Sequence, residues 1–207
     1  MNPIAGKYRF GFILPFQTLI LIGFEYSVWF FFGAAPELLI YDRILIDQGE
    51  LWRLVTAHFV HIDKEHLLLN LSVLLILGAL LESLHTKLLI PTLLSGVIAI
   101  NLGLWFGMES LLYYCGLSGL LNSLFVVVIW QFWNISKDPM ILCLGAANLS
   151  KIGLEITMNE ALFSSISWPP LPEAHFFGVL GGFSILMMAI LNQKINKELN
   201  IDSLVCR

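Results

Sequence analysis

Long uncharged apolar runs dominate this sequence. Six runs, each close to the ~20 residues that a helix needs to cross a bilayer, lie near residues 10–32, 64–82, 88–106, 115–133, 139–157 and 172–192. Of the 207 residues, 57% are apolar and only 13% are charged, which departs strongly from the usage of soluble domains. The pattern predicts an all-α membrane protein in which six transmembrane helices form a single domain, 1–207.

The distribution of lysine and arginine predicts the orientation of these helices. Basic residues favour the cytoplasmic side. A cytoplasmic N-terminus puts seven of them inside (Lys7, Arg9, Lys87, Lys137, Lys194, Lys197 and Arg207) and three outside (Arg43, Arg53 and Lys64). We therefore expect both termini in the cytoplasm and an outer loop over 36–63. No basic cluster indicates nucleic-acid binding, and the three cysteines have no disulfide or zinc spacing.

Under this topology, three helices begin at the outer face, and unusual polar residues gather at their beginnings. His66 and Asn70 lie on the second helix, Ser118 on the fourth and His175 on the sixth. Polar side chains at membrane depth are costly, so each one is a functional hypothesis by default. The topology places all four at one depth, where they can meet.

Ser118 lies within Gly116-Leu117-Ser118-Gly119. Taken alone, such a sequence in an apolar run is more often a helix-packing motif than a catalytic one. In the functional interpretation, the flanking glycines leave the hydroxyl uncrowded and let backbone N–H groups approach an oxyanion. The motif becomes informative only if a base lies within reach of the serine.

His175 is the candidate base. Gly178 and Gly182 share its helical face, and Gly119 begins a second small-residue surface on the fourth helix. Close packing of these surfaces would carry the imidazole to Ser118, where it can accept the hydroxyl proton. Since no acidic residue is obviously placed to orient His175, the sequence predicts a dyad rather than a triad.

His66 and Asn70 are i, i+4 neighbours on one helical face. Both can donate hydrogen bonds to a tetrahedral oxyanion, and the alternative is a polar lining for a water-filled entrance. Zinc binding by His58, His61 and His66 is a weaker interpretation, because the metalloprotease spacings are absent. We therefore predict no metal site and no cofactor.

Charged residues also lie well inside the fifth and first apolar runs. Lys151 and Glu155 form an i, i+4 pair in the fifth run, for which mutual neutralisation is the simplest interpretation. Glu25 lies in the outer half of the first run and is expected to face the bundle interior.

Together these segments resemble the rhomboid intramembrane serine proteases in order, spacing and helix placement from about residue 50 to 190. The resemblance implies a six-helix rhomboid-like bundle that cleaves transmembrane client proteins near the outer face of the membrane. Ser118 would be the nucleophile and His175 the general base, while His66, Asn70 and the Ser118 N–H would bind the oxyanion. Trp52 and Arg53 would belong to an outer loop that lies partly in the bilayer. The matching segments are Trp52-Arg53, His61, His66-x-x-x-Asn70, Gly116-Leu117-Ser118-Gly119 and Ala174-His175-x-x-Gly178-x-x-x-Gly182.

Finer features are similar to the rhombosortase branch: the compact length, the Ser118-Gly119 context and the Lys151…Glu155 pair. That branch implies a bacterial inner-membrane enzyme that processes proteins with a Gly-Gly-containing C-terminal anchor. One position departs from the family pattern, because Asn122 stands where many rhomboids carry a tyrosine that supports the catalytic histidine. A hydrogen bond is then expected to orient His175. The alternative is a non-catalytic rhomboid-like protein that escorts clients, although such relatives typically lack the serine or the histidine.

Overall fold

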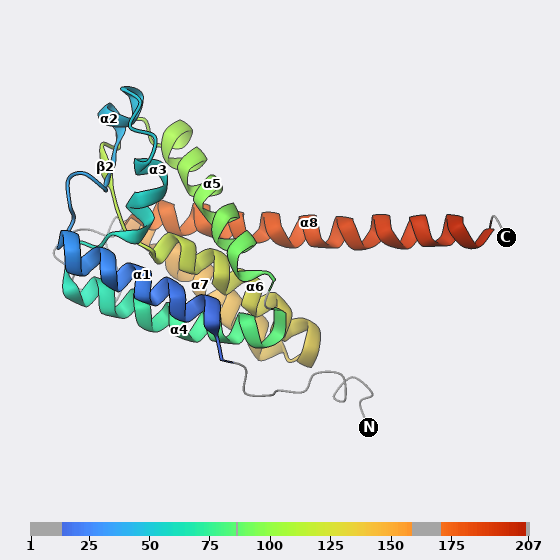
Figure 1. The fold of residues 1–207 in the computed structure, drawn as a ribbon. Helices are drawn as coiled ribbons and strands as arrows, with labels where there is room; N and C mark the ends of the chain where they lie inside the picture. Colours follow the sequence, from blue (N-terminus) through green and yellow to red (C-terminus); the bar gives the residue numbers. More distant parts are fainter. Residues whose placement is uncertain (1–13, 86, 159–170, 206–207) are drawn as a thin grey trace.

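The chain folds mainly into helices that pack along one another (Figure 1). A computed structural model describes residues 14–85, 87–158 and 171–205. In order, the elements are α1 (Phe16–Phe32), β1 (Tyr41–Asp42), α2 (Arg43–Asp47), α3 (Arg53–Thr56), the 3-10 helix η1 (Ala57–Phe59), α4 (Lys64–His85), α5 (Leu89–Gly107), β2 (Tyr113–Tyr114), α6 (Ser118–Ser136), α7 (Pro139–Met158) and α8 (Pro172–Val205).

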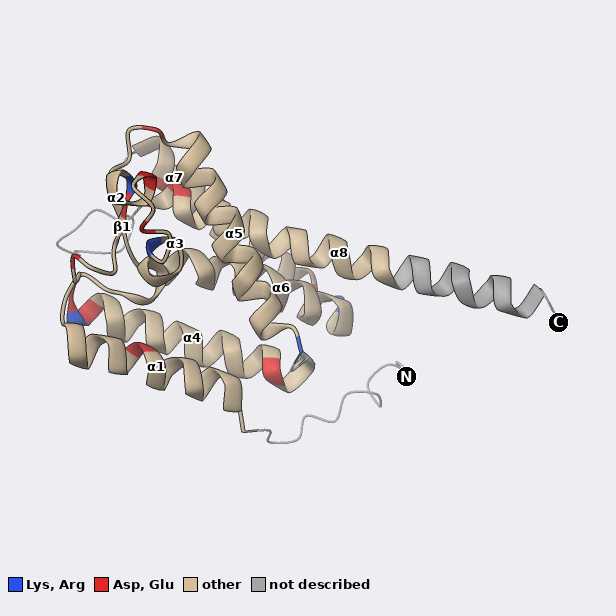
Figure 2. Ribbon diagram, turned by 45° about the horizontal axis from the view of Figure 1, so that its top comes forward, with Lys and Arg blue, Asp and Glu red and all other residues tan. Residues whose placement is uncertain are grey.

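Five helices in the described residues are long and apolar enough to cross a membrane: α4, α5, α6, α7 and α8. The chain is thus an integral, multi-pass membrane protein. Figure 2 shows charged residues mostly in the loops and near helix ends. The first predicted span, 10–32, corresponds to α1, which has 17 residues and is shorter than the other five. Residues 10–13 of the predicted 10–32 run lie outside the described residues.

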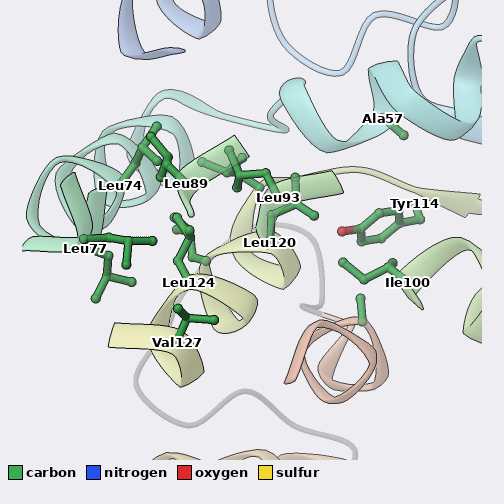
Figure 3. Packing of buried hydrophobic residues seen from close by; sticks show 14 of the residues in the cluster. Ala57, Leu74, Leu77, Leu89, Leu93, Ile100, Tyr114, Leu120, Leu124 and Val127 are labelled. Atoms are coloured by element: carbon green, nitrogen blue, oxygen red, sulfur yellow. The ribbon is translucent and has the colours of Figure 1, made fainter. Parts of the chain in front are cut away.

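The centre of the bundle is formed by α4, α5, α6 and α8, where α6 contacts each of the other three, while α1 lies along α4 (Figure 1). Leucines and valines from successive turns fill the space between these helices (Figure 3). Leu74, Leu120 and Leu124 are fully buried among them. In contrast, α7 buries only Ile152 and Glu155, so most of its surface is apolar and exposed, as suits a lipid-facing helix.

Glycines allow α8 to approach its neighbours at backbone distance. A Cβ at Gly178 would overlap the carbonyl oxygen of Gly119 on α6, and one at Gly182 would lie 2.6 Å from the Ser123 carbonyl oxygen. The Ser123 hydroxyl donates a 2.7 Å hydrogen bond to the Gly178 carbonyl across the same contact. Small residues therefore fix how α8 lies on α6.

The loop between α1 and α4 is folded rather than extended. Arg53 is almost fully buried within it, donates to the carbonyl oxygens of Glu37 and Ile40, and pairs with Glu50 at 2.7 Å. Trp52 is half-exposed and donates to the Leu38 carbonyl oxygen at 3.2 Å. Charge-assisted bonds from one guanidinium to several carbonyls make the loop a defined unit.

The start of α6 differs from the predicted span over 115–133. Tyr41 and Asp42 of the loop pair antiparallel with Tyr114 and Tyr113, so this stretch is extended. Gly116 then adopts a φ of +125°, which is not a helical conformation, and the helix begins only at Ser118. The membrane span of the last helix, Pro172–Asn192, has the predicted bounds, and the helix itself continues to Val205.

Candidate active site

Four helix ends meet at one end of the bundle. There α4, α6 and α8 begin and α7 ends, which brings the first turns of three helices beside the last turn of a fourth. His66 lies in the first turn of α4, Ser118 is the first residue of α6, and His175 lies in the first turn of α8. Polar residues far apart in the sequence thereby reach the same depth.

The hydroxyl of Ser118 lies within hydrogen-bonding distance of His175, with 2.9 Å between Oγ and Nε2. His175 is buried and Ser118 is half-buried. The contact follows from the packing of α8 on α6, since Gly178 follows His175 by one turn and touches Gly119, the neighbour of Ser118. A hydroxyl beside a neutral imidazole is the arrangement that activates a serine.

The backbone just before Ser118 is held against the loop. Gly116 N–H donates to the Ala57 carbonyl oxygen at 2.9 Å, and the Tyr114 hydroxyl donates to the Gly116 carbonyl oxygen at 2.9 Å. A Cβ at Gly116 would lie 2.9 Å from Cε1 of His66. The glycine therefore lets the His66 ring lie directly on the backbone that leads into Ser118. The first N–H groups of a helix have no partner within it, so α6 presents donors at this point.

A cavity of about 220 Å³ opens beside the serine. Residues of α4, α6, α7 and α8 line it, among them Asn70, Ser118 and His175. The Asn70 side chain is buried, and its Nδ2 has no hydrogen-bond partner among the described residues. An unpaired buried amide donor is available to an oxygen atom placed in the cavity.

Asn122 connects Ser118 to α7. Its Nδ2 donates to the Ser118 carbonyl oxygen at 2.9 Å, and its Oδ1 accepts from Asn148 Nδ2 at 2.9 Å. These two hydrogen bonds run to Ser118 and to α7, and neither of them reaches His175.

Glu155 is the polar residue that sequence reasoning missed at this site. Its buried carboxylate lies with Oε2 3.9 Å from Nδ1 of His175, on the other side of the ring from Ser118. Lys151 pairs with both carboxylate oxygens, at 2.7 and 2.8 Å. The pairing was expected, but the approach to His175 was not. The sequence did contain a signal for this approach. Lys151 and Glu155 lie at the end of the fifth run, which the predicted topology places at the same membrane depth as the start of the sixth run.

The sequence of this chain is similar to those of known proteins. The rhomboid domain family matches residues 48–192, which is more than two thirds of the chain. This protein belongs to the rhomboid family. It is also similar to the Bacillus subtilis (strain 168) protein named "Putative rhomboid protease YdcA", with 27% identity over 187 residues that cover 86% of this chain and 90% of that protein. Family membership indicates transmembrane proteins as substrates.

Two further histidines of this rhomboid lie in the loop next to the site. His58 is fully buried, with ring nitrogens 3.4 Å from the Tyr114 hydroxyl and from Asn101 Nδ2. Burial lowers the pKa of His58 to about 4. For His61, burial and then the neighbouring His66 lower the pKa to about 3, although Asp63 acts in the opposite direction. Both rings are therefore neutral at physiological pH.

Glu25 of α1 lies behind these histidines, buried as expected, with Oε2 3.9 Å from His61 Nε2. The His61 and His66 rings meet edge to face, 5.1 Å between centroids. Among the described residues, no three His, Cys, Asp or Glu side chains converge into a group that could hold a metal ion.

Proposed function

We propose that this rhomboid is an intramembrane serine endopeptidase with Ser118 as the nucleophile and His175 as the general base. The single observation that supports this most is the 2.9 Å separation of Ser118 Oγ and His175 Nε2. A hydroxyl needs such a base to attack a peptide carbonyl, and unperturbed imidazole titrates near neutral pH. The cavity beside the serine offers the substrate a place to bind.

In the proposed reaction, Ser118 Oγ attacks the scissile carbonyl carbon while His175 Nε2 takes the hydroxyl proton. The carbonyl oxygen becomes an oxyanion that accepts hydrogen bonds from Asn70, His66 and the backbone N–H of Ser118. Collapse of this intermediate breaks the C–N bond, and His175 returns the proton to the leaving amine. Water activated by the same histidine then hydrolyses the acyl-enzyme.

The position of these residues suggests where the client is cut. All of them lie at one end of their helices, and the charge distribution favours an outer location for that end. A client helix must unwind to expose a carbonyl, because its backbone groups are paired within the helix. We therefore propose cleavage near the outer edge of a client's transmembrane segment, in a bacterial inner membrane.

We further propose a rhombosortase-like client with a glycine-rich segment beside its C-terminal transmembrane helix. Glycine lowers the cost of unwinding a helix by about 1 kcal/mol relative to alanine. Basic residues after the client's helix would hold its C-terminus in the cytoplasm. The Ser118-Gly119 context and the Lys151–Glu155 pair support this branch.

A fluorophosphonate probe tests the enzymatic proposal directly. The purified protein should become labelled at Ser118, and Ser118→Ala should abolish the labelling. An unlabelled but folded wild-type protein would point instead to a non-catalytic protein that binds or escorts transmembrane clients.

A second experiment tests the client. The protein is co-expressed with a client bearing a Gly-Gly-containing C-terminal anchor, and the mature C-terminus is mapped by intact-mass spectrometry. We expect a Ser118-dependent cut at the outer edge of the helix that is lost when the glycines are replaced by leucine. An outer cut that tolerates leucine would retain the protease and reject the rhombosortase assignment.

A further inference from the structure

We infer that Glu155 is a positioning residue that holds His175 through Nδ1 while Nε2 of the same ring serves Ser118. The inference rests on the proposed function and adds to it a third group that acts through the histidine. The carboxylate of Glu155 thereby joins the Ser118 hydroxyl and the His175 imidazole as a third group of the site.

The imidazole lies between two oxygen atoms. Ser118 Oγ is 2.9 Å from Nε2, and Glu155 Oε2 is 3.9 Å from Nδ1, the nitrogen on the opposite side of the ring. The second distance exceeds a hydrogen bond, but a small rotation of the ring or a bridging water would complete it. Catalytic hydrogen bonds are often long before substrate binds and tighten in the complex.

The carboxylate is itself fixed. The Glu155 side chain is only 2% exposed, and Lys151 Nζ contacts both of its oxygens from one helical turn earlier. A carboxylate oxygen can accept more than one hydrogen bond, so the pairing with Lys151 is compatible with an imidazole N–H as a further donor. The lysine keeps a negative charge tolerable in a buried place and holds it in one direction.

Within the part of the chain that the structure describes, the other polar groups around His175 do not offer an alternative orienting acid. On α4 these are His66 and Asn70, on α6 Ser118 and Asn122, on α7 Asn148 and Lys151, and on α8 itself Glu173 in the first turn. The fourth neighbour, α5 (Leu89–Gly107), contains no charged residue. Among these elements, Glu155 is the acid that the structure brings within 4 Å of the ring.

A carboxylate at Nδ1 has two effects on this chemistry. It selects the tautomer with the proton on Nδ1, which leaves the Nε2 lone pair directed at the serine hydroxyl. It also stabilises the imidazolium formed when Nε2 takes the hydroxyl proton. Both effects raise the rate at which Ser118 is acylated and leave ground-state binding of the substrate unchanged.

The competing explanation is that Glu155 only neutralises Lys151. A pair of variants separates the two roles: Glu155→Gln removes the carboxylate charge, and Lys151→Met/Glu155→Gln removes both charges. Each is compared with wild type by the rate of fluorophosphonate labelling at Ser118. Thermal unfolding in the same detergent identifies any variant that fails to fold.

For a positioning residue, we expect Glu155→Gln to slow labelling by about 10²-fold, in the range of general-base effects, and the double variant to be equally slow. Glu155→Asp, which keeps the charge, should recover part of the rate. Glu173→Gln is the matched control, because it removes a carboxylate two residues from His175 and should label like wild type.

Two results would overturn the inference and leave the protease intact: wild-type labelling by Glu155→Gln, or recovery to within about twofold of wild type in the double variant. Failure of folded wild-type protein to label at all would instead refute the proposed function, and this inference with it.

Discussion

Nε2 of His175 lies 2.9 Å from Oγ of Ser118, although 57 residues separate them in the sequence. The first residue of α6 and the first turn of α8 are brought together because Gly178 packs on the backbone of Gly119. The geometry of this pair therefore depends on a helix contact without side chains as much as on the two polar residues.

The pair should act as one catalytic unit. Ser118→Ala and His175→Ala are each expected to abolish cleavage of a transmembrane client without loss of membrane insertion. The double variant should be no worse than either single variant, because members of such a unit are strongly non-additive. Cleavage by purified proteins in liposomes measures this, and appreciable turnover by Ser118→Ala would exclude the serine mechanism.

The oxyanion donors should affect the chemical step rather than binding. Asn70→Ala is expected to lower kcat by about 10²-fold, as loss of such a donor does in known serine proteases, with a smaller change in KM. His66→Ala should behave alike, since its ring lies against the Gly116 backbone that leads into Ser118. Steady-state kinetics on a peptide client provide the test. If only KM changed, both residues would be lining of the cavity.

The sequence predicted the spanning helices well, because each apolar run must satisfy its backbone within the membrane and only a helix does so in one segment. It also predicted that Ser118 and His175 share a depth, since both begin helices of the same direction. These expectations depend on counting residues along the chain. They need no knowledge of which helices touch.

The position of Glu155 could not be predicted in the same way. Its approach to His175 depends on how α7 is rotated about its own axis, and the pattern of apolar residues on a lipid-facing helix leaves that rotation undetermined. The start of α6 was missed for a related reason. Residues 115–117 are as apolar as the helix that follows, yet the pairing of Tyr114 with Tyr41 and the positive φ of Gly116 keep them out of it.

The stability of the protein should fall in mild acid because of its buried loop histidines. The pKa of His58 is about 4 and that of His61 about 3, against 6.5 in an unfolded chain. At pH values between the folded-state and the unfolded-state pKa, the unfolded state binds more protons than the folded state. The free energy of unfolding therefore decreases as pH falls below 6.5. The loss at pH 5 is about 2 kcal/mol for each ring.

Unfolding in detergent at pH 7 and pH 5 measures this effect. His58→Asn removes one titrating ring and should reduce the difference in the free energy of unfolding between the two pH values. An unchanged difference would mean that other groups cause the acid sensitivity.

A last prediction concerns two glycines that differ in what surrounds them. A methyl group at Gly178 would overlap the Gly119 carbonyl oxygen, whereas one at Gly153 on α7 would meet nothing within 4 Å. Backbone cannot move aside as a flexible side chain can, so Gly178→Ala should destabilise the protein by about 3 kcal/mol or more. It should also slow labelling of Ser118, since α8 carries His175.

Gly153→Ala should remain within about 1 kcal/mol of wild type, as its only change is in helix propensity. Unfolding by SDS, followed by tryptophan fluorescence, compares the two variants under one condition. Equal stability of the two would show that the close contact of α6 and α8 does not hold the active-site end of the bundle together.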